Sequence, residues 1–94
     1  MEEGVPMLVA LAETKKYLRV DYEDEDTLIR KFIRTAAILI RDTLRVDTVT
    51  PSPITRTACL YAVAYLFEHR ENADMDELTR NLRYMLSSER KAAF

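Results

Sequence analysis

The chain has little of what catalytic and disulfide-bonded domains need. Its 94 residues include one glycine, three prolines, one cysteine, one histidine and no tryptophan. A single cysteine cannot form an intramolecular disulfide, and a single histidine without a cysteine pair leaves zinc sites and nucleophilic triads short of their minimum residues. No glycine-rich loop follows a strand, so a phosphate-binding loop lacks its parts as well. We therefore predict no enzymatic activity, no catalytic residue, no metal site and no cofactor.

Charge and hydropathy exclude further classes of protein. With 14 basic and 16 acidic side chains, the net charge is -2, which is not the basic surplus of a dedicated nucleic-acid binder. No apolar run approaches the roughly 18 residues of a membrane span. The acidic start Met1–Pro6 lacks the basic region of a signal peptide. We expect no membrane partner and a reducing, cytoplasmic setting for one small domain over residues 1–94.

Scarce glycine and proline leave few positions for tight hairpins and favour helices. The sequence predicts an all-α fold, a small four-helix domain with two long antiparallel helices, a loop between them, and short N- and C-terminal helices. We expect these helices over Leu11–Leu18, behind the poor capping residue Ala10; from an Asp24 cap to about Arg45; from Pro53, behind a Ser52 cap, to about Asn72; and from an Asp74 and Glu77 capping-box pattern through Leu86.

The third helix is apolar nearly all round, so we expect it to be covered on both sides and to need other copies of the chain for that cover. Tyr61 and Tyr65 lie one turn apart, as a core or interface pair would, and Phe67 points to another side. On the same helix Cys59 is interpreted as a small buried hydrophobe. His69, near the end, is interpreted as a partner for the last carbonyls rather than as a ligand.

An acidic run precedes the second helix, over Asp21–Asp26. As a calcium loop it fails, because its sixth position is Asp26 where the sharp turn needs glycine and its twelfth is Phe32 where a bidentate glutamate is needed. A helix cap beside a solvated acidic surface is the favoured interpretation.

Arginines gather within roughly 60° of one another on the polar half of the second helix, with Ile38 at their margin. The first 26 residues carry eight acids and three bases, a net of -5, whereas the remainder carries 11 bases and eight acids, a net of +3. This asymmetry favours head-to-tail contact between identical subunits, in which an acidic lip with Asp21 and Asp24 meets the arginine face of the next copy and the set closes as a ring. The alternative is an ordinary solvated helix face. The stripe consists of Arg30, Arg34, Arg41 and Arg45.

Two blocks of residues stand in a distinctive order. The first is Leu8-Val9-x-Leu11 with Lys15-x-Tyr17-Leu18-Arg19-Val20-Asp21, and the second is Ala62-x-x-Tyr65-x-x-Glu68-x-Arg70-Glu71; between them Asp24-Glu25-Asp26 opens the long helix and a proline-containing loop follows. From about Val5 to Leu86 the chain resembles the small head-tail connector (adaptor) proteins of long-tailed phages and prophages. It departs from them at Ala10, where the family usually has threonine or serine, and in a loop with less glycine.

The resemblance implies a structural virion protein. Such a subunit assembles as a homo-oligomeric ring beneath the portal after DNA packaging, extends the DNA channel and provides the platform for a stopper or tail-completion protein. Its implied partners are the portal protein, that stopper or tail protein, and double-stranded DNA that passes through the lumen without sequence-specific binding. Its implied location is the neck of the virion, after assembly in the host cytoplasm.

Within that role we expect the tail, from Arg83 and chiefly residues 87–94, to dock on the portal, because it ends with basic residues and an apolar side chain. A frayed helix end without a partner is the alternative. The portal-docking candidates are Arg83, Arg90, Lys91 and Phe94. The subunit-interface candidates are Asp21, Asp24, Arg30, Arg34, Ile38, Arg41, Tyr61, Tyr65 and Phe67.

Two other functions stay open at this point. One is a small helical DNA-binding protein of the packaging machinery, similar to a terminase small subunit, or a regulator, with the arginines on phosphates. Steep salt-dependent DNA binding would favour it, whereas the pI of about 5.4 speaks against it. The other is a helical interaction domain that works as a dimer.

Overall fold

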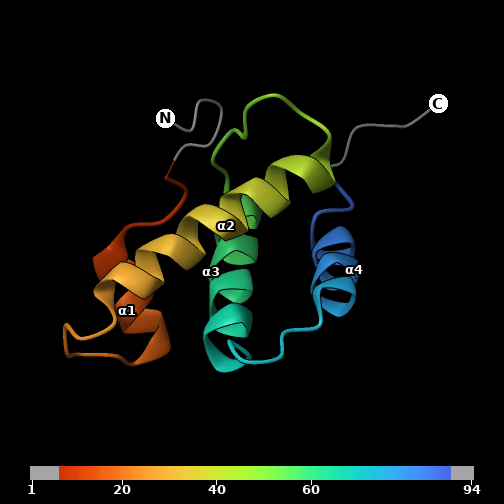
Figure 1. The fold of residues 1–94 in the computed structure, drawn as a ribbon. Helices are drawn as coiled ribbons and strands as arrows, with labels where there is room; N and C mark the ends of the chain where they lie inside the picture. Colours follow the sequence, from red (N-terminus) through yellow and green to blue (C-terminus); the bar gives the residue numbers. More distant parts are fainter. Residues whose placement is uncertain (1–6, 90–94) are drawn as a thin grey trace.

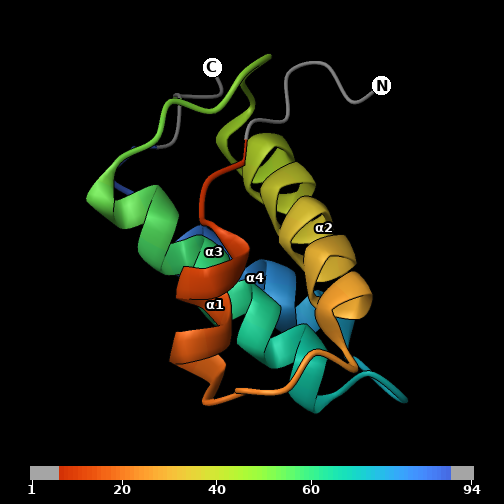
Figure 2. The same cartoon turned by 90° about the vertical axis from the view of Figure 1, so that its left-hand side faces the viewer.

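The computed structural model describes residues 7–89. Every regular element in this range is a helix, which confirms the predicted four-helix fold: α1 (Leu11–Leu18), α2 (Asp26–Leu44), α3 (Pro53–Glu68) and α4 (Met75–Met85). Figure 1 shows α2 crossing obliquely in front of α3, with α1 beneath one end of α2 and α4 beneath the other. Figure 2 confirms that α1 and α4 lie on opposite sides of α3. The two long helices therefore form the centre, and the two short helices flank it.

Small side chains bring α2 and α3 together. Ala36 and Ala37 of α2, and Ala58 and Ala62 of α3, are all buried. Alanines at a crossing allow two helix axes to approach closely, because no bulky side chain separates them. Around this crossing, the branched apolar side chains of α2 fill the core, namely Ile29, Ile33, Ile40 and Leu44.

The cover of α3 comes largely from its own subunit. α1, α2 and α4 all contact α3, and Leu60, Tyr61 and Phe67 are partly buried against the same core. The large apolar side chain of α3 that stays exposed is Ile54. The expectation that α3 needs other copies of the chain to shelter it is therefore wrong for most of its surface, because a 94-residue chain supplies three helices around it.

The first two helices begin differently from one another. α1 has the predicted bounds behind Ala10, whose N–H donates to Glu13 Oε1 at 3.4 Å. α2 begins at Asp26 behind Glu25, and no side chain caps it. The predicted Asp24 cap is thus wrong: the chain enters the helix one residue later, where basic side chains from other elements hold the carboxylates of Glu25 and Asp26.

The start of α3 confirms one prediction, and its end corrects another. Ser52 caps α3 by accepting a hydrogen bond from the Thr55 N–H at 3.1 Å, as predicted. α3 ends at Glu68 and not near Asn72. His69 follows as its C-cap, and the ring Nδ1 lies 2.9 Å from the Tyr65 carbonyl oxygen, which confirms its predicted role beside the last carbonyls.

Irregular segments add to the core in a way that the sequence did not predict. Leu8 and Val9, in the extended stretch before α1, are each 1% exposed, and so is Val49 in the loop between α2 and α3. The Leu8 carbonyl also accepts a hydrogen bond from Arg56 Nη1 at 3.2 Å. The core thus closes around α2 and α3 with side chains from the stretch before α1 and from the loop between α2 and α3.

Candidate assembly surfaces

The acidic run before α2 divides into paired and unpaired carboxylates. Arg70 Nη1 lies 2.8 Å from Glu25 Oε2. Lys15 Nζ lies 2.7 Å from Asp26 Oδ1, and this second contact is an ion pair without hydrogen-bond geometry. The three acids before them are exposed, and within residues 7–89 they have no ion-pair partner. We call these three the acidic lip: Asp21, Glu23 and Asp24.

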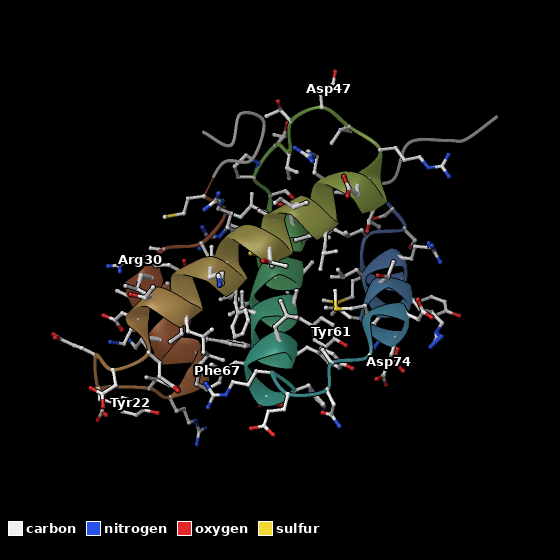
Figure 3. All side chains as sticks on the ribbon, viewed as in Figure 1. Tyr22, Arg30, Asp47, Tyr61, Phe67 and Asp74 are labelled. Atoms are coloured by element: carbon white, nitrogen blue, oxygen red, sulfur yellow. The ribbon has the colours of Figure 1, made fainter. Side chains whose placement is uncertain are left out.

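Ion pairs also fix the corner that carries the acidic lip. Lys15 ties α1 to the start of α2, and Arg70, just beyond α3, reaches the same turn. The Arg70 guanidinium carbon also lies 4.5 Å from the centroid of the Phe67 ring, a cation–π contact. Phe67, labelled in Figure 3, is therefore partly covered by Arg70 in its own subunit, and it is less available to a neighbour than its sequence position predicts.

The arginine stripe lies on the solvent side of α2, as predicted. Arg30, Arg34 and Arg45 are exposed, Arg41 is half-buried, and Ile38 lies half-buried beside them. Arg41 Nε lies 3.6 Å from the carboxylate of the adjacent Asp42. Arg30 lies one turn from the start of α2, close to the acidic lip of its own subunit. Arg41 and Arg45 lie at the far end of the helix, about 22 Å and about 28 Å from its start at 1.5 Å per residue.

α4 adds basic and aromatic side chains to that far end. Its inner side carries Leu78 and Leu82, which are fully buried as predicted. On its outer side Arg80 and Arg83 are exposed, and Tyr84 is 76% exposed. Because α4 packs beneath the C-terminal end of α2 (Figure 1), these arginines and those ending α2 share one end of the molecule. We call this set the basic flank: Arg41, Arg45, Arg80 and Arg83.

Tyr65 joins α3 to the start of α4. Its hydroxyl accepts a hydrogen bond from the Asp74 N–H at 3.1 Å and lies 2.9 Å from Glu77 Oε1, to which it donates. The Asp74 carboxylate in turn accepts from the Glu77 N–H at 3.0 Å. Only this half of the predicted capping box forms directly, because Glu77 reaches the Tyr65 hydroxyl and not the Asp74 N–H. The Tyr65 ring stacks on the His69 ring, with 4.2 Å between the two ring centroids.

The burial of Tyr65 within its own subunit corrects its prediction as a subunit-interface residue. Its side chain is only 8% exposed, and burial raises the pKa of its hydroxyl above the ordinary tyrosine value. Tyr61, labelled in Figure 3, lies one turn earlier, is half-buried and accepts a hydrogen bond from Asn81 Nδ2 at 2.7 Å. The tyrosine pair thus belongs to the contact between α3 and α4 within one subunit.

Cys59 and the C-terminal segment hold the remaining residues that the sequence analysis singled out. Cys59 is fully buried, as predicted, and burial raises the pKa of its thiol to about 12. Glu89 accepts a hydrogen bond from Ser52 Oγ, at 3.1 Å to Oε2, so the start of the tail lies against the cap of α3. The docking candidates Arg90, Lys91 and Phe94 lie outside the described residues, whereas Arg83 is exposed.

One surface feature was absent from the predictions. An open apolar groove lies where α3 begins and α4 ends, lined by Pro53, Ile54, Thr57 and Met85. Its residues lie far apart in the sequence, and no local pattern places Met85 beside Ile54. Over residues 7–89 there is no group of three or more histidine, cysteine or acidic side chains arranged for a metal ion, and no helix is long and apolar enough to cross a bilayer.

Comparison with known proteins gives one match. The family model described as phage gp6-like head-tail connector protein matches residues 9–91, a range that takes in all four helices, the acidic lip and the basic flank. No curated protein and no solved structure gives a significant match. The resemblance in the two sequence blocks is thereby confirmed, and the connector family is structural. The chain belongs to the phage gp6-like head-tail connector family, the proteins that join the head of a phage to its tail.

Proposed function

We propose that this connector works as a homo-oligomeric ring beneath the portal, where it extends the DNA channel and offers a platform for the stopper or tail-completion protein. Family membership supports the general role. The observation that carries the ring is the separation of charge along a subunit measuring 46 × 26 × 24 Å, with the acidic lip at one end of α2 and the basic flank at the other. Opposed, complementary ends favour heterologous contact, and such contact forms a ring when the rotation closes.

The far half of the arginine stripe is the part that receives the acidic lip. Arg30 is next to the lip of its own subunit, so a neighbour's lip placed there would meet acids as well as the arginine. Arg45 has no ion pair among residues 7–89 and is exposed. Arg34 and Ile38, midway along α2, extend this contact toward the centre of the helix.

Weak attraction for DNA fits a channel. The net charge of -2 gives the chain no general surplus of cations for phosphates. A protein that neutralises few phosphates holds DNA loosely, which lets the polyanion slide through the lumen. The connector therefore acts mechanically, by docking, sealing and transmitting, in the neck of the virion.

The tail supplies the contact to the portal. Glu89, the last described residue, is hydrogen-bonded to the Ser52 cap at the first turn of α3. Arg83 is exposed two residues before Met85, at the same end of the subunit. Removing residues 90–94 keeps Glu89 on its cap and should leave the subunit folded while abolishing capture by the portal; capture retained by the shortened chain would contradict portal docking by the tail.

Sedimentation velocity tests the ring. Assemblies formed at about 0.05 M salt, alone or with the portal, should dissociate at about 0.5 M, because contacts between exposed charges are screened. Arg45→Glu should prevent assembly, and adding Asp24→Arg in the same chain should restore it by exchanging the two charges. Arg30→Glu, with the same change of charge beside the lip, is the matched control and should still assemble. A wild-type chain that stays monomeric at every concentration, with and without portal, would overturn the ring.

A further inference from the structure

The outer side of α4 carries an exposed aromatic side chain that the proposed contact between charges leaves without a role. Tyr84 is 76% exposed, more than any other large hydrophobic residue in residues 7–89. Arg80 lies one turn before it, on the side of the helix opposite the buried leucines, and Arg83 borders the same side. Both arginines are exposed. A tyrosine between arginines, without cover from its own subunit, is typical of a contact with another protein, because interfaces are enriched in both residue types.

Positive charge dominates the part of α4 that carries this tyrosine. Arg80 and Arg83 have no ion-pair partner in the described part of the chain. The acids nearby are occupied or remote. Glu77 accepts a hydrogen bond from α3, and Asp76 lies in the first turn, about 12 Å from the exposed tyrosine along the helix axis. The carboxylate that follows α4 is held on the Ser52 cap. The second half of the outer side therefore attracts negative charge.

The acidic lip of another copy offers the matching surface. Tyr22 lies within the lip, between Asp21 and Glu23, and is 49% exposed. The three carboxylates of the lip have no ion-pair partner over residues 7–89. Figure 3 shows Tyr22 at the corner of the molecule on the other side of α3 from α4, so the lip cannot reach the outer side of α4 in its own subunit. A second copy can bring a tyrosine between carboxylates to a tyrosine between arginines.

We propose that the outer side of α4 in one subunit receives the acidic lip of the next. Tyr22 packs against Tyr84, and the carboxylates of the lip pair with Arg80 and Arg83. Packed aromatic side chains gain binding energy beyond the area that they bury, and complementary charges around them select the correct partner surface. The proposal rests on the proposed ring: opposite charges bring the two ends together, and the two tyrosines hold neighbouring subunits in register.

Disulfide trapping tests the proposal directly. Tyr22→Cys and Tyr84→Cys in one chain should, on mild oxidation of the assembled protein, give a ladder of covalent oligomers on a non-reducing gel. Either substitution alone should give at most dimers, since heterologous contact then offers only one of the two thiols. The natural Cys59 does not interfere, because it is fully buried. The matched control, Tyr22→Cys with Met75→Cys, places the second thiol at an exposed position of α4 about 14 Å away along the axis and should give no ladder.

A double-mutant cycle gives a second measurement. Tyr22→Ala and Tyr84→Ala should each raise the concentration needed for half-assembly by about tenfold, as the loss of a central interface residue does. Together they should weaken assembly little beyond either one alone, because each single change already removes the contact. Both side chains are exposed, so circular dichroism should show the wild-type fold. Tyr17→Ala, at a 53% exposed position of α1, is the control and should change assembly less than about threefold. Losses that multiply in the double variant would contradict direct contact.

The outcomes separate the two proposals. If the variant with cysteines at positions 22 and 84 sediments as a ring and gives no ladder, the ring stands and the contact on α4 is overturned. If the wild-type protein never assembles, with or without portal, the ring and this contact fall together. Should Tyr84→Ala assemble like wild type but lose retardation of duplex DNA in a gel, the outer side of α4 binds DNA and the contact is again overturned. A ladder, with losses that do not multiply, supports both proposals.

Discussion

The α2–α3 pair and α4 are held in the fold by different kinds of contact. Between α2 and α3, alanines and branched apolar side chains are buried and pack the crossing. α4 is attached by leucines on one side and by hydrogen bonds at its edge, from Asn81 to the Tyr61 hydroxyl and through the Tyr65 hydroxyl to Asp74 and Glu77. The central pair is thus a scaffold, whereas α4 depends on a few polar contacts that can be changed singly.

This difference matters for assembly. The acidic lip and the basic flank lie on the corner before α2 and on the end that α4 completes, both outside the α2–α3 crossing. Substitutions in the crossing should therefore act on stability, and substitutions at the two ends should act on assembly. Variants of each kind test whether the two properties are separable in this small chain.

The largest expected effect is in the scaffold. Ile40 of α2 is completely buried, and Ile40→Ala should lower the free energy of unfolding by about 3 kcal/mol, the cost of lost burial together with the cavity left behind. Urea unfolding followed by circular dichroism measures it. Ile54→Ala, at an exposed position of α3, is the control and should cost under about 0.5 kcal/mol. Equal losses from the two variants would contradict the scaffold.

A smaller effect is expected at the attachment of α4. Tyr65→Phe keeps the ring but leaves the Asp74 N–H and the Glu77 carboxylate without the hydroxyl, and the melting temperature should fall by roughly 5 °C. Tyr61→Phe, which removes one half-buried hydroxyl from Asn81, should cost less. Amide hydrogen exchange should show the loss of protection in Tyr65→Phe concentrated in α4. A uniform loss across α2 and α3 would argue that α4 is part of the scaffold.

The same hydroxyl gives stability a dependence on alkaline pH. Burial raises the pKa of Tyr65 in the folded chain above its unfolded value, which is about 10 for tyrosine. The folded state then keeps a proton that the unfolded state releases, so this contribution is present below about pH 10 and is lost as the pH rises through the folded pKa. Tyr65→Phe should therefore lose stability less steeply than wild type above that pH.

Local patterns in the sequence predicted what depends on local contacts. The bounds of α1, the Ser52 cap of α3 and the buried leucine side of α4 follow from neighbours within one or two turns. The exposed arginines of α2 follow from the same periodicity. These features required no knowledge of which elements meet.

What the sequence could not predict depends on partners far along the chain. α2 starts where Lys15 and Arg70 hold the carboxylates of Asp26 and Glu25, one residue beyond the start that an Asp24 cap predicts. Tyr65 looks like an interface residue until Asp74 and Glu77 fold back onto its hydroxyl. The apolar groove likewise exists only because the end of α4 returns to the start of α3.

The smallest expected effect concerns two arginines with the same backbone. Arg19 and Arg45 end α1 and α2 in the left-handed region, at φ of 63° and 60°, where a side chain costs energy that glycine avoids. Arg19→Gly and Arg45→Gly should therefore each stabilise the subunit by about 0.5 to 1 kcal/mol, measured as a higher urea midpoint with an unchanged slope.

These two substitutions remove the same charge from opposite ends of the molecule. Arg45 belongs to the basic flank, so Arg45→Gly should make a more stable subunit that assembles less readily. Arg19 lies beside the acidic lip, where a lost cation leaves the lip more negative, so Arg19→Gly should be more stable and assemble at least as well. If both variants assemble like wild type, Arg45 is only a strained cap; if both assemble poorly, net charge matters and its position does not. Opposite responses from equal gains in stability would show that the arginine at the end of α2 serves the neighbouring subunit at the expense of its own fold.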